Sequence, residues 1–252
     1  MENFAQTKVS DIVTENYLTA MIFSKYGIDF CCNGKRTIAR ACKDDAALID
    51  SLEAEIEQFF ATQAQTTQAV DYAGWSLEVL LEYVVDKHHS YIRDHIPLIQ
   101  GYLHKLCRVH GKNHPELFEI DQLFTASSDD LLAHLQKEEQ ILFAYIFEIV
   151  AASNNNTQLR RPPFITIKNP VAMMMNEHIT EGERFLRIRE LSNNFTAPAD
   201  GCNTYKAAYA ALADYERDLH LHIHLENNLI FERAIAVEEE LFNSSTKQAG
   251  QS

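Results

Sequence analysis

A ten-residue repeat limits the fold of this chain more than any other feature. The segments HLQKEEQILF (134–143) and HIHLENNLIF (222–231) align at an offset of 88 residues. Both carry a histidine, a glutamate four positions later, a hydrophobic pair and a phenylalanine. His220 and His224, which alternate with the second histidine as they would along a strand, have no counterparts in the first copy. A spacing of four places two side chains on one face of a helix, so the repeat predicts two helices.

In both segments the histidine and the glutamate lie on an apolar helical face. The faces are Ile120, Phe124, Leu131, His134, Glu138, Ile141 and Tyr145 in the first segment, and Ala208, Leu212, Tyr215, Leu219, His222, Glu226 and Leu229 in the second. Burying an uncompensated charge in a core costs several kcal/mol. Each pair therefore needs a partner inside the core.

The whole chain is predicted to be all-α. It has only eight glycines and six prolines, and apolar residues recur at spacings of three and four. Four long helices are expected at about 75–110, 116–153, 170–196 and 203–242. Four long helices joined by loops fit a four-helix bundle.

A polar stretch without periodicity, TQAQTTQAVDYAG, separates a short N-terminal region from the bundle. The expected organisation is a small helical domain at 1–62, a linker at 63–74, the bundle at 75–243 and a disordered tail at 244–252.

The other two bundle helices each carry one histidine on an apolar face. His89 shares its face with Ile92, and His178 shares its face with Phe185. The interval to the following repeat histidine is 45 residues in the first pair and 44 in the second, so these side chains are expected at matching heights. His88 is the alternative to His89, and the choice rests on this spacing. Six side chains should converge at mid-bundle: His89, His134, Glu138, His178, His222 and Glu226.

Four histidines and two carboxylates suit two metal ions of octahedral preference, and iron is the leading candidate. Zinc fits less well, because it usually takes four ligands and favours thiolates. Each iron ion would bind two histidines and share both carboxylates, with room for an oxo or hydroxo bridge and for oxygen or nitric oxide. Gly182, one turn after His178, would leave space there. Asp130 and Glu177 are expected to orient the ligands or relay protons.

The remaining histidines are expected to be solvated or hydrogen-bonded, because a single histidine on a helix face is usually not a ligand. They are His88, His95, His104, His110, His114, His220 and His224.

Composition excludes several classes of partner. The net charge of -14 provides no basic surface for nucleic acid or for an anionic membrane. The longest apolar stretch, ILFAYIFEIVAA, is broken by Glu148 and is too short to span a bilayer. The five cysteines lack the spacing of a disulfide framework, which fits a reducing compartment. We therefore expect a cytoplasmic protein.

A second signature lies near the N-terminus, where YGIDFCCNGKRTIARAC runs from Tyr26 to Cys42. Together with the six bundle residues, it resembles the hemerythrin-like di-iron proteins that repair iron-sulfur clusters and begin with a small ScdA-type domain. The resemblance covers nearly the whole chain, and it assigns metal binding to the same six residues. It implies a stress-response protein that acts on iron-sulfur proteins damaged by nitric oxide or peroxide. It also implies that a labile non-haem di-iron centre donates the iron.

Cys31 and Cys32 lie beside Lys35 and Arg36 and precede an expected helix, an arrangement that favours reactive thiols. They are expected to act in redox chemistry, to accept a nitrosyl group or to relay iron. The alternative is two small buried residues in a tight turn. The other cysteines, Cys42, Cys107 and Cys202, are expected to be structural, although Cys42 would join the pair if the fold brought it close.

Other functions stay open. The same centre would serve a sensor that binds oxygen or nitric oxide, or a nitric oxide reductase, so the sequence does not decide whether the protein is an enzyme. A thiol-bearing N-terminal domain favours repair over simple binding. Ferritin-like oxidases carry Glu-x-x-His on two helices, whereas this chain has His-x-x-x-Glu. Formation of a homodimer through the N-terminal region also stays open.

Overall fold

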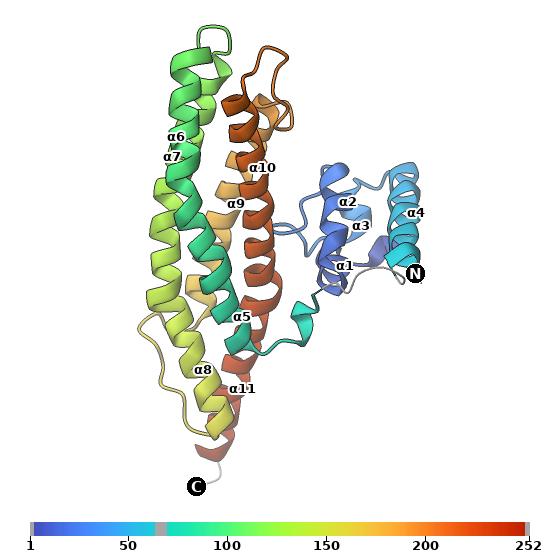
Figure 1. Ribbon diagram of the computed structural model, residues 1–252. Coiled ribbons are helices and arrows are strands. Elements are labelled where there is room, and N and C mark those ends of the chain that lie inside the picture. Colours follow the sequence, from blue (N-terminus) through green and yellow to red (C-terminus); the bar gives the residue numbers. More distant parts are fainter. Residues whose placement is uncertain (1–2, 64–69, 250–252) are drawn as a thin grey trace.

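Helices form all the regular elements in the part of the chain that the structure describes, residues 3–63 and 70–249. This computed structural model shows an elongated four-helix bundle with a smaller helical domain against one side (Figure 1). The all-α prediction is confirmed. The N-terminal domain consists of η1 (Phe4–Gln6), α1 (Val9–Glu15), η2 (Tyr17–Thr19), α2 (Ala20–Lys25), α3 (Ile38–Ala41) and α4 (Ala46–Gln63).

The four bundle helices run alternately up and down (Figure 1). Three of them contain a π turn. The first joins α5 (Leu77–Tyr83), η4 (Val84–His89) and α6 (Ser90–His110); the second joins α7 (Glu116–Lys137), η5 (Glu138–Leu142) and α8 (Phe143–Asn155); the third is α9 (Lys168–Leu191); the fourth joins α10 (Asn203–Leu225), η6 (Glu226–Ile230) and α11 (Phe231–Ala249). They occupy the four segments in which the sequence predicts helices.

Two helix ends differ from expectation. α9 stops at Leu191 instead of residue 196, because Asn193, Asn194 and Phe195 all adopt positive φ, which a right-handed helix cannot contain. α11 continues to Ala249, so most of the expected disordered tail is helical, since its sequence has no glycine or proline before Gly250. Residues 250–252 lie outside the described part.

The expected linker is only partly described. Residues 64–69 lie outside the described part, and Tyr72–Gly74 form a short 3-10 turn, η3, in which Tyr72 is buried. The bundle then begins at Leu77, after Ser76 caps the helix by accepting a hydrogen bond from the Val79 N–H group.

The π turns change which residues face the core. A π turn adds one residue to the helical repeat and rotates the face that follows it. Ile141, expected on the core face, is therefore 51% exposed, and Leu142 is buried in its place. The equivalent Leu229 stays buried, because residues 222–231 of the fourth bundle helix are buried on every side.

Two apolar clusters build the core. One occupies the end of the bundle around η3, α8 and α11, and the other extends from the opposite half of the bundle into the N-terminal domain. The domains also meet through polar contacts: the Tyr17 hydroxyl donates to the Arg217 carbonyl at 3.4 Å, and Lys35 pairs with Glu232 at 2.8 Å. The shared cluster fixes the N-terminal domain against the middle of the bundle.

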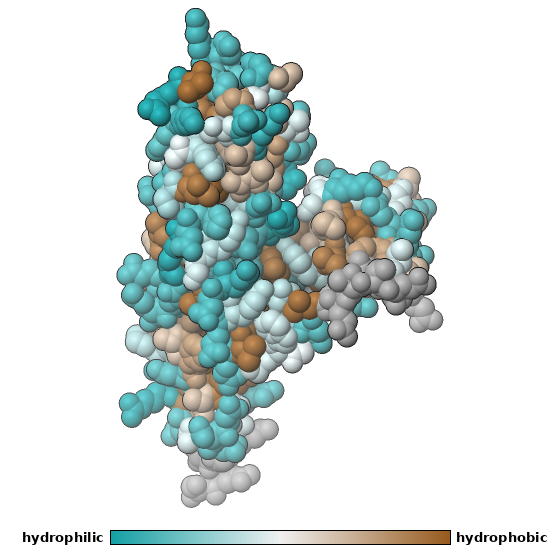
Figure 2. Space-filling model, in the orientation of Figure 1, coloured by the Kyte–Doolittle hydropathy of each residue, from teal (hydrophilic) through white to brown (hydrophobic). Residues whose placement is uncertain are grey.

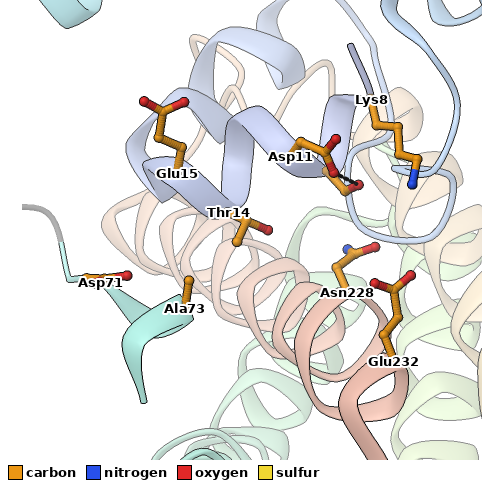
Figure 3. A pocket seen from close by; sticks show the side chains of 9 residues that line it. Lys8, Asp11, Thr14, Glu15, Asp71, Ala73, Asn228 and Glu232 are labelled. Carbon is orange, nitrogen blue, oxygen red and sulfur yellow. Dashed lines mark hydrogen bonds between the residues drawn. The ribbon is translucent and has the colours of Figure 1, made fainter. Parts of the chain in front are cut away.

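A cavity of about 440 Å³ lies at this junction, between α1, η3 and the π turn of the fourth bundle helix (Figure 3). Its lining is rich in carboxylates: Asp11, Glu15, Asp71 and Glu232, together with Lys8 and Asn228. Elsewhere, hydrophilic residues cover most of the visible face of the bundle, and apolar residues form small separate patches (Figure 2). In the described ranges, no helix combines the length and the apolar character needed to cross a membrane.

Candidate metal centre

Six side chains form a polar layer between the two apolar clusters, and none is more than 3% exposed. They are His89, His134, Glu138, His178, His222 and Glu226. Three of them stand at π turns: His89 ends η4, Glu138 begins η5 and Glu226 begins η6. π turns are frequent at functional sites, because the local change of twist re-aims side chains. The structure thus brings together the six residues that the sequence analysis singled out.

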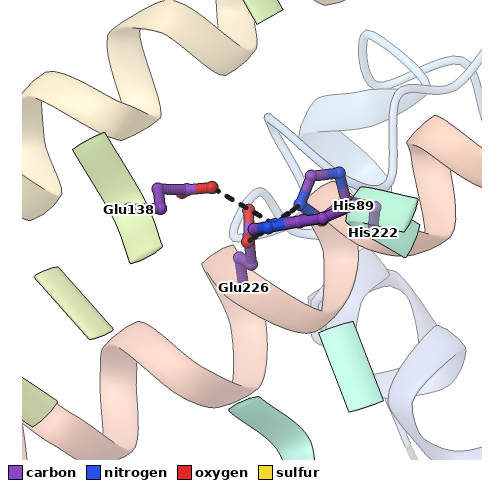
Figure 4. Close-up of side chains that lie close together, drawn as sticks. All are labelled: His89, Glu138, His222 and Glu226. Atoms are coloured by element: carbon purple, nitrogen blue, oxygen red, sulfur yellow. Dashed lines mark hydrogen bonds and ion pairs between the residues drawn. The ribbon is translucent and has the colours of Figure 1, made fainter. Parts of the chain in front are cut away.

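The six residues form two sets of four that share both glutamates. One set contains His89 and His222, whose Nε2 atoms are 3.1 Å apart, and the other contains His134 and His178, whose Nε2 atoms are 3.0 Å apart. Figure 4 shows the first set, in which four side chains from three bundle helices point toward one another.

Each glutamate directs one oxygen to each set. Glu226 places Oε1 at 2.9 Å from His222 Nε2 and Oε2 at 3.2 Å from His178 Nε2. Glu138 places Oε2 at 3.5 Å from His89 Nε2 and Oε1 at 3.2 Å from His134 Nε2. Each glutamate is therefore placed so that its two oxygens could bind one metal ion in each set.

Three of the histidines are oriented through the Nδ1 atom. His89 Nδ1 donates to Glu139 at 2.7 Å, and His134 Nδ1 donates to Glu177 at 2.7 Å. His178 Nδ1 donates to the side-chain oxygen of Asn227 at 2.9 Å. Such partners fix the tautomer of a metal-binding histidine and leave Nε2 free to bind.

The sequence analysis identified Glu177 but missed Glu139 and Asn227. The repeat held the signal, because Glu139 and Asn227 are aligned in it at the same offset of 88 residues. Each directly follows a shared glutamate and supports the histidine of the preceding bundle helix. His222 Nδ1 has no hydrogen-bond partner among the described residues.

The donor set fits metal ions. Nδ1 carries the proton in His134 and His178, so their Nε2 lone pairs face each other unless a cation lies between them. Both oxygens of buried Glu138 lack a hydrogen-bond donor within the described chain. A buried carboxylate without donors is costly, and a metal ion between the histidines and the carboxylates would remove that cost.

The pKa shifts of the buried side chains also fit a site for metal ions. Burial lowers the pKa of His134, but the charge of the nearby Glu138 carboxylate and the hydrogen bond to Glu177 outweigh burial and raise that pKa to about 10. The hydrogen bond from His134 lowers the pKa of Glu177 to about 2. Burial lowers the pKa of His222 to about 3. Without metal, a proton on His134 offsets part of the buried negative charge, and a metal ion would displace it.

Comparisons with known proteins agree with this geometry. Residues 5–59 match ScdA_N, a domain of unknown function (DUF542), and residues 80–234 match the hemerythrin HHE cation binding domain. An iron-sulfur cluster repair protein YtfE from Yersinia pseudotuberculosis is 31% identical over 214 residues, 85% of this chain and 90% of that protein. An iron-sulfur cluster repair protein ScdA from Staphylococcus haemolyticus is 29% identical over 225 residues, 89% of this chain and 96% of that protein.

The chain belongs to the iron-sulfur cluster repair protein family. The match to the hemerythrin HHE domain also implies that the bundle binds iron. Both matched segments lie inside the domains expected from the sequence.

Of the other histidines of this repair-family member, all except His220 have a polar partner within the described residues, and His220 is partly buried. Buried His88 bonds Asp218 at 3.1 Å and stacks on His222, and buried His224 contacts Thr14 and Asn228 at 3.4 and 3.1 Å. His95, His104, His110 and His114 contact other groups near the surface, and His220 lies against Phe30. None of them belongs to the two sets that share the glutamates.

A cavity of about 280 Å³ between α7 and α9 reaches His134 and His178 from outside. Asp130 lies at this cavity but does not hold His134, because its exposed carboxylate pairs with Arg184 at 2.7 Å. Arg184 also pairs, at 2.6 Å, with Glu181, which is buried and accepts a hydrogen bond from Ser127. Glu177 lines the cavity as well and pairs with Lys137. Charged side chains therefore line the cavity that leads to His134 and His178.

The Cys31–Cys32 segment lies directly against the centre. The Cys32 thiol donates to the His178 carbonyl at 3.3 Å, and the Asn227 amide donates to the Cys31 carbonyl at 3.2 Å. Gly182 does leave space, as expected, but Cys32 occupies it: a Cβ added at Gly182 would lie 3.6 Å from the Cys32 sulfur. Cys42 is buried and is not part of the group formed by Asp29, Cys31 and Cys32.

Proposed function

We propose that this protein holds two iron ions in the bundle and repairs damaged iron-sulfur clusters by donating iron from that centre. The observation that carries the proposal is the pair of ligand sets bridged by Glu138 and Glu226, with opposed histidine Nε2 atoms in each set. Relatives of similar length are named iron-sulfur cluster repair proteins. We further propose that the protein works in the cytoplasm.

Iron is the metal that these ligands favour. Each set offers two histidine nitrogens and one oxygen from each shared glutamate, and no thiolate. Imidazole and carboxylate ligands of this kind suit iron, and four protein ligands leave positions open on an octahedral ion. When bound, the pair supplies a redox-active iron centre with room for an oxo or hydroxo bridge and for small ligands.

The residues around the centre favour the release of iron. Ligand set His134–His178 is reached by the cavity between α7 and α9, so one ion would be open to solvent. Protons compete for His134, whose pKa is raised when no metal is bound, and this competition weakens binding as the pH falls. Glu177 and Glu139 hold ligands in position without binding the metal themselves.

A second candidate function is binding or reduction of nitric oxide, or sensing of oxygen or nitric oxide, at the same centre. The open cavity beside His134 favours it, because a diatomic ligand would pass through easily. It differs from repair in one measurable respect: the iron stays bound.

The deciding experiment is anaerobic. The reduced, iron-loaded protein is mixed with an apo-ferredoxin and sulfide, and both cluster assembly and iron left on the donor are followed. Repair predicts that clusters form as iron leaves, and that a Glu226→Ala variant, lacking one bridge, delivers less. Iron that stays bound while nitric oxide is consumed in a parallel assay would replace repair with catalysis. A ferrous chelator in the mixture tests whether iron passes through solution.

A further inference from the structure

A second group of ligand atoms lies outside the bundle, in the loop between α2 and α3. Asp29, Cys31 and Cys32 each offer one atom, and these three atoms lie within 4.8 Å of one another. The two sulfurs are 3.7 Å apart, and Cys31 Sγ is 3.5 Å from Asp29 Oδ1. Two thiols and a carboxylate form a set of a different chemical kind from the histidines and glutamates of the bundle.

These separations fit a tetrahedral metal ion. With metal–sulfur bonds of about 2.3 Å and metal–oxygen bonds of about 2.1 Å, tetrahedral geometry puts two sulfurs about 3.8 Å apart and a sulfur and an oxygen about 3.6 Å apart. The observed distances of 3.7 and 3.5 Å come within 0.1 Å of both values. An ion would therefore enter this group with little movement of its ligands.

The backbone holds the carboxylate in place. Asp29 Oδ1 accepts hydrogen bonds from the N–H groups of Cys31 at 3.1 Å and Cys32 at 2.9 Å, and Asp29 Oδ2 accepts one from the Asn33 amide at 2.6 Å. Carboxylates that bind metals are commonly fixed by outer hydrogen bonds of this kind. A turn held in this way keeps both sulfurs and the carboxylate together before any ion arrives.

The group opens into a cavity between the two domains. This cavity, of about 580 Å³, is lined by all three residues of the loop, by Gly182 on α9 and by His220 on α10. Three protein ligands beside an open space leave the fourth position of a tetrahedral ion free, as in sites where metal ligands exchange. A ligand from another molecule could occupy that position.

The same loop contacts the bundle centre. The Cys32 thiol bonds the carbonyl of His178, a residue of the second ligand set, and Asn227 joins the Cys31 carbonyl to His178 Nδ1. Hydrogen bonds to His178 and Asn227 therefore connect the loop to the bundle centre.

We propose that Asp29, Cys31 and Cys32 form a second metal site, which takes one soft or borderline divalent ion and, in repair, carries ferrous iron as cargo on its way to a client protein that inserts a ligand into the cavity. The thiol protons pass to water in the cavity as the ion binds, and no electron is transferred. The identity of the cargo rests on the proposed function, whereas the existence of the site does not.

The site is tested with Cd²⁺ added to the full-length, iron-loaded protein under reducing, anaerobic conditions. Thiolate-to-cadmium charge transfer in the ultraviolet reports sulfur ligands only, so cadmium that replaces iron in the bundle does not contribute. We expect one equivalent to produce the band, Cys32→Ser to abolish it, and Asp29→Asn to weaken binding while its side-chain oxygen still accepts the backbone N–H groups.

Cys202→Ser is the matched control, because Cys202 is an exposed thiol beside His110 at a distance from this loop and should leave the band unchanged. An absent band, a band that survives in Cys32→Ser, or a band that disappears in Cys202→Ser would overturn the site. If Cys32→Ser does not fold by circular dichroism, the Asp29→Asn titration decides, and unchanged affinity counts against the proposal.

The cargo role has a separate test. Cys32→Ser protein that retains the wild-type iron content should deliver iron to apo-ferredoxin more slowly than wild type. Delivery at the wild-type rate would overturn the transit role. If the wild type delivers no iron while the cadmium band is normal, repair fails and the metal site stands.

Discussion

The Nε2 atoms of His134 and His178 face each other at 3.0 Å, and both side chains are buried. Both rings use Nδ1 to donate outward, to Glu177 and to Asn227, so neither can readily present a proton on Nε2 while neutral. Only a cation, a proton or a metal ion, relieves this contact. A proton or a metal ion is therefore expected between these two nitrogen atoms.

Removing one of these histidines should remove metal. We expect His134→Ala to lower the iron content well below two ions per chain, because one set loses a nitrogen ligand. His220→Ala should leave iron nearly unchanged, since His220 lies outside both sets. Iron and protein are quantified on the same samples. An equal loss of iron in the two variants would mean that the ligand assignment is incorrect.

The residues behind the ligands should also affect affinity. Glu139→Gln keeps a side-chain oxygen near His89 Nδ1 but removes the charge that orients the ring. Loss of such a partner typically costs about 10- to 100-fold in metal affinity. Competition with a ferrous chelator measures the change, and Glu148→Gln, an exposed residue on α8, serves as the control. Equal affinities in both variants would remove Glu139 from the site.

The sequence predicted the bundle and the convergence of six side chains at its centre, because helix spacing and the repeat both report position on a helix. It failed where the helix departs from the regular period. Ile141 lies outside the core because η5 contains an extra residue, and a periodicity of 3.6 cannot show such a turn. The outward-facing Nδ1 partner Glu139 was missed for a different reason: it lies off the apolar face that guided the analysis.

The local sequence pattern could not predict contacts between segments that are distant in the chain. Cys32 fills the space beside Gly182, although 150 residues separate them, and no spacing rule connects the two. Cys202, expected to be structural, is exposed and contacts His110, 92 residues away. Such pairs depend on how the loops and the N-terminal domain dock, which follows from the complete fold.

Iron removal should destabilise the protein. A bound metal ion would compensate the buried carboxylates and the opposed nitrogens, so metal binding should favour the folded chain. A ligand present at 100 times its dissociation constant stabilises by about 2.7 kcal/mol, and each bound ion adds a contribution of this kind. Thermal unfolding of iron-loaded and chelated samples measures the effect. An unchanged midpoint of thermal unfolding would show that the folded protein does not depend on metal for its stability.

Cys202 should react with alkylating reagents near neutral pH. The backbone N–H of Tyr205 at the start of α10, together with the His110 imidazole, lowers the pKa of Cys202 to about 7. Its thiolate is therefore the main form above that pH, and the alkylation rate should rise through pH 7 and then level off. Rates are read by mass spectrometry of iodoacetamide-treated protein.

Cys107 provides the comparison within the same chain. Burial raises the pKa of Cys107 to about 11, and its thiol donates to the Leu117 carbonyl. Its alkylation should stay slow until well above neutral pH. His110→Ala should move the Cys202 profile to higher pH without changing that of Cys107. Identical pH profiles for the two thiols would contradict the assignment.

Docking of the N-terminal loop should depend on the small size of residue 182. An alanine at Gly182 would place its Cβ in ordinary contact with the Cys32 sulfur, at 3.6 Å, so Gly182→Ala should be tolerated. A leucine would push further into the space that Cys32 fills, so Gly182→Leu should displace the loop and speed the labelling of Cys32. Gly101→Leu is the control, because nothing lies within 4 Å of a Cβ there. Both leucines gain up to about 1 kcal/mol in helix propensity. Labelling of Cys32 that is equally slow in both leucine variants would show that the loop does not rest on this glycine.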